Sequence, residues 1–282
     1  MKITVLGTAA ATSVPLPFCR CEVCEKARQN GGKDCRKRSS IVINEDLLID
    51  LGPDTASASF LYGMDLSRIQ YLLQTHSHAD HFDAGIFVTR HKDYATVAPT
   101  HLDILCSRGT FDDMNEQVKR QEPAYDLYSA QSRADMAFDY TPIRKNEILS
   151  FGDYTVHALD SRHDARVEAM NYIVSYQGNH ILYAVDLLRF DEEAWEILRK
   201  YRFSLVFMDQ TYGKGFNAGG HTDAGMVAEY VDRMRKEAII DAETLVLATH
   251  ISHEGNNVHA VMEEEAQKNG YHIAWDGMEI SI

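Results

Sequence analysis

Short runs rich in β-branched residues recur along the chain and alternate with stretches whose apolar residues are spaced by three and four. The short runs predict strands, which we expect at residues 3–7, 39–44, 47–52, 69–75, 101–107, 154–160, 171–176, 180–186, 204–210 and 244–250. The helical spacing predicts helices over residues 191–202, 223–240 and 258–269.

Many strands with a few interspersed helices indicate an α/β protein with helices on the outer faces of its sheets. The chain contains no repeat of 20–50 residues and no Pro/Ser-rich linker, so we expect one integrated domain over residues 1–282. Residues 120–133 are polar and aperiodic, and we expect them to form a surface loop or lid.

Five of the apolar runs end abruptly in a polar side chain that could bind a metal. These residues are Asp50, His76, Asp186, Asp209 and His250. Because strand ends are rigid, polar groups gathered at one edge of a sheet can build a site. The pattern therefore predicts a cluster of these side chains.

The composition, 45% hydrophobic and 25% charged, is that of a globular protein, and no apolar run is long enough for a membrane helix. The first 18 residues suit a strand and a turn better than a signal peptide, so we expect a cytoplasmic protein. A formal net charge of −14 argues against a nucleic-acid partner. It leaves room for a small phosphorylated substrate, since bound cations reverse the local field.

The segment 75–81, THSHADH, contains four side chains that bind metals, namely His76, His78, Asp80 and His81. Imidazole nitrogens and carboxylate oxygens suit Zn²⁺, Mn²⁺ or Fe²⁺. Residues this close in sequence can serve a common metal pair only if the chain turns, and the small spacers Ser77 and Ala79 permit that. The alternative is a polar loop with surface histidines.

This HxHxDH motif, with isolated His and Asp residues later in the chain, resembles the metallo-β-lactamase superfamily. Further matching segments are GTAAATSVP, LLIDLGPD, SRH, YAVD and THISHEGN. The CxCxxC, THISH and DGMEI motifs resemble the PhnP-like phosphodiesterases within it. The resemblance implies a four-layer αββα sandwich of two mixed β-sheets flanked by helices.

The resemblance also implies two active-site cations. His76, His78 and His163 would bind the first, Asp80, His81 and His250 the second, and Asp186 would bridge them; Asp80 is also counted as catalytic. His157 is the alternative to His163. Asp50 is expected to orient the HxHxDH loop, whereas Asp209 could either orient a ligand or contact the substrate.

Cys19, Cys21 and Cys24 place three thiols within six residues, which indicates a metal site sooner than disulfides. A structural zinc needs a fourth ligand, which the resemblance places at His253. A redox pair or plain buried thiols are the alternatives. Cys35 and Cys106 are interpreted as ordinary small apolar residues.

The resemblance favours cleavage of small, including cyclic, phosphodiesters by a metal-bridging hydroxide, with His221 as general acid. His221 lies in GGHTD at residues 219–223, where two glycines and the start of a helix suit a phosphate group. The alternative for His221 is an exposed loop histidine.

The alternatives for the whole chain are an RNA-processing nuclease, a lactonase or thioesterase on the same fold, and a non-catalytic metal-binding module. The motifs do not choose between Zn²⁺, Mn²⁺ and Fe²⁺ in the active site, and the resemblance suggests a homodimer.

Overall fold

The β-branched runs form two seven-stranded sheets in the computed structural model, which describes residues 1–216 and 219–282. The first sheet has the order β14-β1-β2-β3-β4-β5-β6. Its strands are β1 (Lys2–Gly7), β2 (Ser40–Ile43), β3 (Leu47–Ile49), β4 (Tyr71–Leu73), β5 (Leu102–Cys106), β6 (Phe138–Pro142) and β14 (Glu279–Ser281). Strands β3 to β6 are parallel, and β14 and β2 run antiparallel to β1.

The second sheet has the order β13-β12-β11-β10-β9-β8-β7. Its strands are β7 (Ile148–Phe151), β8 (Tyr154–Asp160), β9 (Met170–Tyr176), β10 (Asn179–Ala184), β11 (Leu205–Asp209), β12 (Leu245–Thr249) and β13 (His272–Ile273). Strands β10 to β13 are parallel, whereas β7, β8, β9 and β10 pair antiparallel.

The inner faces of the two sheets share one apolar core. Ile3 and Ile41 of the first sheet belong to the same buried cluster as Val156, Tyr172 and Phe207 of the second. Burial of this apolar surface is the main force that holds the sheets together.

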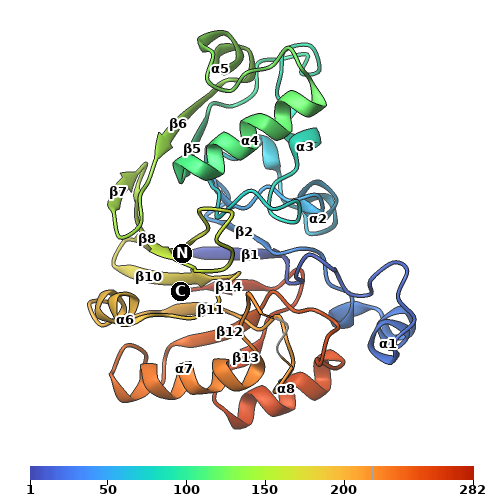
Figure 1. Cartoon of the computed structure of the whole chain (residues 1–282), viewed down its shortest axis with the longest axis vertical. Helices are drawn as coiled ribbons and strands as arrows, with labels where there is room; N and C mark the ends of the chain where they lie inside the picture. Colours follow the sequence, from blue (N-terminus) through green and yellow to red (C-terminus); the bar gives the residue numbers. More distant parts are fainter. Residues whose placement is uncertain (217–218) are drawn as a thin grey trace.

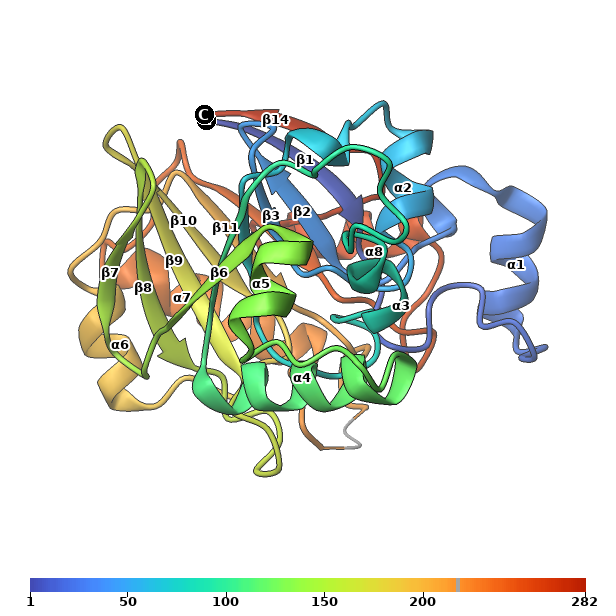
Figure 2. The same cartoon turned by 90° about the horizontal axis from the view of Figure 1, so that it is seen from above.

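Helices cover both outer faces (Figure 1). On the first sheet lie α2 (Thr55–Leu61), α3 (Ala84–Val88), α4 (Arg108–Gln121) and α5 (Ala130–Met136). On the second lie α6 (Glu192–Leu198), α7 (Ala224–Lys236) and α8 (His259–Lys268). The predicted four-layer αββα sandwich is therefore confirmed. Helix α1 (Glu22–Asn30) extends away from both sheets, as Figure 2 shows from above, and two 3₁₀ turns lie at Gly32–Asp34 and Leu66–Arg68.

All ten predicted strands and all three predicted helices form, with shifted ends. The prediction for residues 120–133 is wrong in part, because α4 includes residues 120 and 121 and α5 begins at Ala130. Ser107 and Ser129 cap these two helices by accepting backbone hydrogen bonds. Within the described residues, no helix has the length and apolar character that a membrane span needs.

Candidate metal centre and active-site cleft

The predicted cluster of strand-terminal side chains forms at one edge of the two sheets. Asp50, Asp186 and His250 follow β3, β10 and β12, and each has a positive φ, between 50° and 64°. Non-glycine residues seldom adopt this conformation, and it is concentrated at functional sites. All three side chains are buried.

The HxHxDH segment turns in the way that shared metal binding requires. The backbone amides of His81 and Phe82 both donate to the carbonyl of His78. Gly52 contacts this turn so closely that a Cβ atom there would lie 2.3 Å from the Asp80 carbonyl oxygen. The turn can therefore pack against the end of β3 only because residue 52 is a glycine.

His76, His78 and His163 form the first group of ligand atoms. His163 Nε2 lies 3.3 Å from His78 Nδ1. Nitrogens about 2.1 Å from one tetrahedral zinc are about 3.4 Å apart, so this spacing suits a shared cation. The Nε2 atom of His76 is buried and has no hydrogen-bond partner. An orphaned buried nitrogen of this kind fits a metal ligand.

Asp80, His81, Asp186 and His250 form the second group. The Nε2 atoms of His81 and His250 are 3.4 Å apart. Asp186 Oδ2 lies 2.7 Å from His81 Nε2 and 3.1 Å from His250 Nε2, whereas Asp186 Oδ1 lies 3.3 Å from His163 Nε2. The two oxygens of Asp186 thus face the two groups, as a bridging carboxylate would.

Three of the clustered histidines also hydrogen bond with the protein through their Nδ1 atoms. The Nδ1 atoms of His163 and His250 hydrogen bond with the Gly220 carbonyl and with Thr211 Oγ1, both at 2.8 Å. His81 donates from Nδ1 to Asp50 Oδ2 at 2.7 Å. Such contacts fix which ring nitrogen of a histidine faces the metal. In these three histidines, Nε2 faces the cluster.

Asp50 orients His81, as predicted from the sequence. It is fully buried and also accepts hydrogen bonds from the Thr75 amide at 2.8 Å and the Gln74 side chain at 3.0 Å.

Replacing Asp50 with Asn should lower metal affinity or activity by roughly 10–100-fold, the usual effect of losing such a partner. The check is a metal titration of apoprotein alongside the half-exposed control Asp103→Asn, on β5. Equal affinities in both variants would show that Asp50 does not position His81.

The electrostatics of the two groups differ. Burial lowers the pKa of His76 well below its usual value, so that imidazole stays in the neutral form that binds metals. Burial also acts to lower the pKa of His81 and the pKa of His250. However, Asp80 and Asp186 hold the pKa of His81 well above its usual value, and Asp186 raises that of His250 to about 10. The carboxylates therefore create a field that favours cations at this position.

His221 lies at the same cluster, and it is not an exposed loop histidine. Its side chain is 16% exposed, and its Nδ1 atom lies 3.2 Å from Asp209 Oδ2 and 3.1 Å from Thr211 Oγ1. Asp209 is fully buried and also accepts from the amides of Leu187 and Thr211. Asp209 was expected either to orient a ligand or to contact the substrate. Its position inside the protein, against His221, corresponds to the orienting role.

The expectation that the helix after GGHTD could hold a phosphate is wrong. The Asp223 carboxylate caps α7 by accepting from the amides of Gly225 and Met226. These amides are satisfied, and the cap adds a negative charge that would repel a phosphate group.

The metal groups open into a cleft of about 370 Å³. Its lining includes His78, Asp80, His163, Asp186, His221 and His250, together with Ala10 to Thr12 and Gly219 to Gly220. This volume is at the lower end of the range for small-molecule sites.

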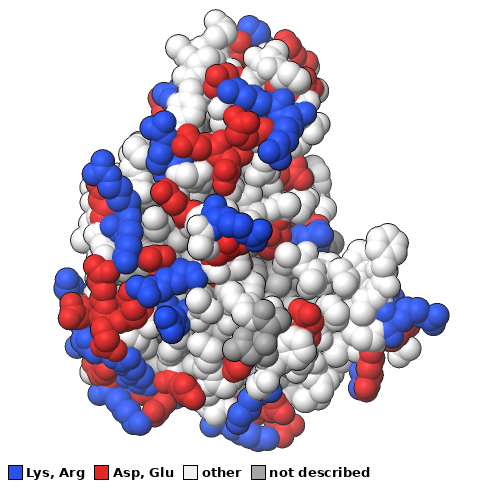
Figure 3. Space-filling model, viewed as in Figure 1, with Lys and Arg blue, Asp and Glu red and all other residues white. Residues whose placement is uncertain are grey.

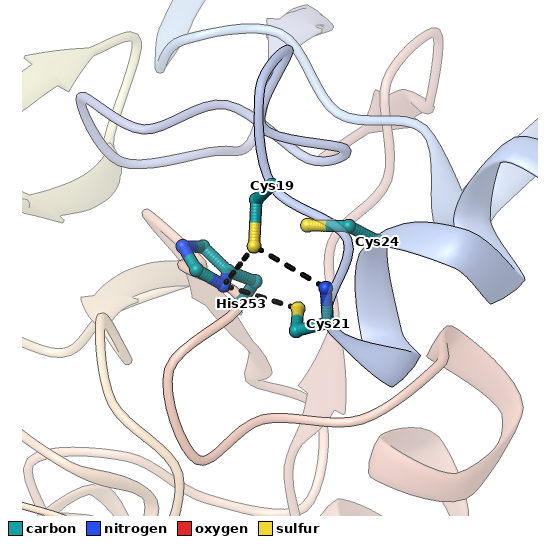
Figure 4. A group of neighbouring side chains, drawn as sticks. All are labelled: Cys19, Cys21, Cys24 and His253. Atoms are coloured by element: carbon teal, nitrogen blue, oxygen red, sulfur yellow. Dashed lines mark hydrogen bonds between the residues drawn. The ribbon is translucent and has the colours of Figure 1, made fainter.

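The cysteine cluster converges with His253, as Figure 4 shows. His253 Nδ1 lies 3.4 Å from Cys21 Sγ and 3.9 Å from Cys19 Sγ, and the four ligand atoms lie within 4.8 Å of one another. The Leu16 amide donates to Cys24 Sγ. The chemistry of the set fits a closed tetrahedral zinc site.

This cluster connects α1 to the loop after β12. His253 is three residues beyond His250, and the intervening Ile251 exchanges backbone hydrogen bonds with Thr8 and Ala10. A metal held by the cysteines would therefore brace the segment that carries His250.

The histidine and cysteine residues set aside from the sites lie elsewhere. His157 hydrogen bonds with Tyr201 Oη at 2.8 Å and is not part of the metal groups. Cys106 is fully buried in the core beside α4, and Cys35 donates to the Ala27 carbonyl.

Sequence reasoning missed Thr211, whose hydroxyl contacts both His221 and His250, because a lone threonine carries no motif.

Comparisons with known proteins agree with this geometry. Residues 45–251, well over half of the chain, match the family described as Beta-lactamase superfamily domain. Coenzyme PQQ synthesis protein B of Methylobacterium radiotolerans is 31% identical over 137 residues, which are 44% of this chain and 46% of that protein. The chain matches less than half the length of its curated relatives.

Two solved structures share the fold over the whole chain. A diphosphatase from the PhnP family has a TM-score of 0.72 at 18% identity, covering 100% of this chain and 97% of that one. Zn²⁺-bound PqqB from Methylobacterium extorquens has a TM-score of 0.70 at 17% identity, covering 100% of both chains.

Proposed function

The chain belongs to the metallo-β-lactamase superfamily, and from this premise we propose that it is a dinuclear metal-dependent hydrolase that cleaves small phosphodiesters. The observation that carries the proposal is the position of Asp186 between two groups of ligand atoms, with His221 beside them in a cleft of about 370 Å³. Two divalent cations held there, Zn²⁺ or Mn²⁺, would acidify a water molecule and offset the charge of a phosphate.

The residues of the chain supply the remaining parts of the reaction. His221 Nδ1 faces Asp209, so its Nε2 is the ring nitrogen left to donate a proton to the departing oxygen. The buried Asp209 carboxylate contacts His221 Nδ1 and fixes the orientation of the ring. Asp80 and Asp186 hold the negative charge that would retain both cations beside a dianionic transition state.

Replacing His221 with Ala should lower kcat on a nucleoside 2′,3′-cyclic phosphate, whose alkoxide leaving group needs a proton, by roughly 10²–10⁴-fold, the usual contribution of a general acid. The metal content should stay unchanged. Steady-state kinetics with added Mn²⁺ or Zn²⁺ check this, with the exposed His101→Ala as control. Undiminished turnover in His221→Ala would remove His221 from the mechanism.

The competing activities are distinguished by substrate. A panel of chromogenic phosphodiester, phosphomonoester, lactone and thioester substrates should give the highest kcat/KM for the diester. An RNA nuclease needs a continuous basic surface, but acidic and basic side chains are interspersed on the face in Figure 3. Preferred hydrolysis of the lactone or thioester would replace the phosphodiesterase proposal.

A further inference from the structure

Glu254 brings a negative charge to the lining of the metal cleft, outside the metal groups. The other charged residues of the lining that are neither metal-group members nor His221 are Asp164 and Arg166, which form an ion pair with each other at 2.6 Å. Within residues 1–216 and 219–282, the half-buried Glu254 carboxylate forms no ion pair and no hydrogen bond. An unpaired carboxylate in a cleft that would bind an anionic substrate favours a substrate group that donates hydrogen bonds to it.

The backbone holds Glu254 in place at the cleft. Its amide donates to Ser252 Oγ at 3.1 Å, and its carbonyl accepts from the Gly213 amide at 3.1 Å. The loops after β11 and β12 approach each other so closely that a Cβ atom on Gly213 would lie 1.7 Å from the Gly255 carbonyl oxygen. Glycine permits this contact because it has no Cβ atom, and the contact fixes Glu254 beside the residues that follow β11.

Aromatic rings adjoin the Glu254 carboxylate. Tyr212 lines the same cleft, and burial raises the pKa of its phenol, which the charge of Glu254 raises further. The centre of the Tyr212 ring lies 5.2 Å from that of Phe216 and 5.7 Å from that of His221. Phe216 is 40% exposed, so its ring offers a surface on which a flat base can stack.

The position of His221 determines which part of a substrate reaches these residues. In the proposed function His221 protonates the departing oxygen, and its ring plane makes an angle of 88° with that of Tyr212. In a nucleoside 2′,3′-cyclic phosphate, the departing oxygen belongs to the ribose that carries the base. The base of such a substrate therefore lies on the side of Tyr212, Phe216 and Glu254.

We infer that Glu254 recognises guanine in nucleoside 2′,3′-cyclic phosphates, while the base stacks on Phe216. Guanine presents two adjacent donors, N1–H and its exocyclic amine, which match the two oxygens of a carboxylate. Adenine has no donor at N1, and cytosine presents only its amine. The inference rests on the proposed phosphodiesterase activity and narrows its substrate to a guanosine ester.

Steady-state kinetics on guanosine, adenosine and cytidine 2′,3′-cyclic phosphates, with added Mn²⁺ or Zn²⁺, test the inference. The wild-type kcat/KM should be about tenfold higher for the guanosine compound, the discrimination expected of one bidentate contact with a base. Glu254→Gln should remove this preference. Phe216→Leu should raise KM for all three compounds, because stacking does not distinguish the bases. The control Glu265→Gln removes a negative charge from the exposed side of α8 and should keep the preference.

Equal kcat/KM values for the three compounds in the wild-type protein would overturn the inference and leave the phosphodiesterase activity standing. A guanine preference that survives in Glu254→Gln would also overturn it. Because Glu254 follows His253 in the chain, the zinc content of Glu254→Gln is measured as well. Loss of zinc together with activity on all three compounds would assign Glu254 a structural role and contradict the inference.

Calorimetric titration of the metal-loaded protein with guanosine and adenosine 3′-monophosphates separates failure of the proposed activity from failure of base recognition. Tighter binding of the guanosine compound, weakened in Glu254→Gln, without hydrolysis of any cyclic phosphate, would support base recognition and refute the proposed activity. Equal binding of the two monophosphates would contradict the inference independently of catalysis.

Discussion

Asp186→Asn should lower kcat/KM on bis(p-nitrophenyl) phosphate by at least about 10³-fold, because one carboxylate faces both groups of metal ligands. The amide keeps the size of the side chain but loses its charge and one of its two acceptor oxygens. Asp186 Oδ2 is buried and lies 2.7 Å from His81 Nε2 and 3.1 Å from His250 Nε2, so an amide NH₂ placed there would face these two histidines unfavourably.

The measurement is steady-state kinetics with saturating Mn²⁺ or Zn²⁺, together with the melting temperature of each variant. Asp139→Asn, an exposed substitution on β6, is the matched control and should retain wild-type rates. Activity of Asp186→Asn within tenfold of wild type, in a folded protein, would mean that Asp186 does not bridge the two cations.

Cys21→Ser should lower the melting temperature by on the order of 10 °C, since the binding energy of a structural zinc is folding energy. Burial opposes ionisation of this thiol, but hydrogen bonds from the Cys24 amide and from Cys19 and His253 lower its pKa to about 7. Thiolate is therefore available near neutral pH, where it can bind zinc. Loss of the zinc would also free the loop that carries His250 and reduce activity.

Differential scanning calorimetry of wild type, Cys21→Ser and Cys35→Ser checks this. Cys35 is a partly buried thiol outside the cluster, so its serine variant measures the cost of exchanging sulfur for oxygen alone. Similar melting temperatures in the two variants would favour plain thiols over a zinc site.

The clustering of five of the polar side chains at the site was predictable because each one ends an apolar run, namely Asp50, His76, Asp186, Asp209 and His250. Parallel strands end at a common edge, so Asp50, Asp186 and His250 meet whenever their strands enter these two sheets. The HxHxDH segment adds a local turn. These features depend on short-range sequence, whereas the placing of His163 and His253 with them was implied by the family resemblance. The structure brings all of these side chains together.

Other parts of the structure depend on contacts that are distant in sequence. Helix α4 was missed although Phe111, Met114 and Val118 follow a helical spacing, because its exposed face is rich in charge. Thr211 acquires its role only when β11 and β12 lie side by side.

The metal content of the purified protein tests the central claim most directly. Inductively coupled plasma mass spectrometry should find about three metals per chain in the wild type, as the ligand sets imply. His78→Ala should lose one or two of them and keep the zinc of the cysteine cluster. Cys21→Ala should lose one and keep the pair in the cleft. A single metal in the wild type, or the same loss in both variants, would contradict a dinuclear centre beside a separate structural site.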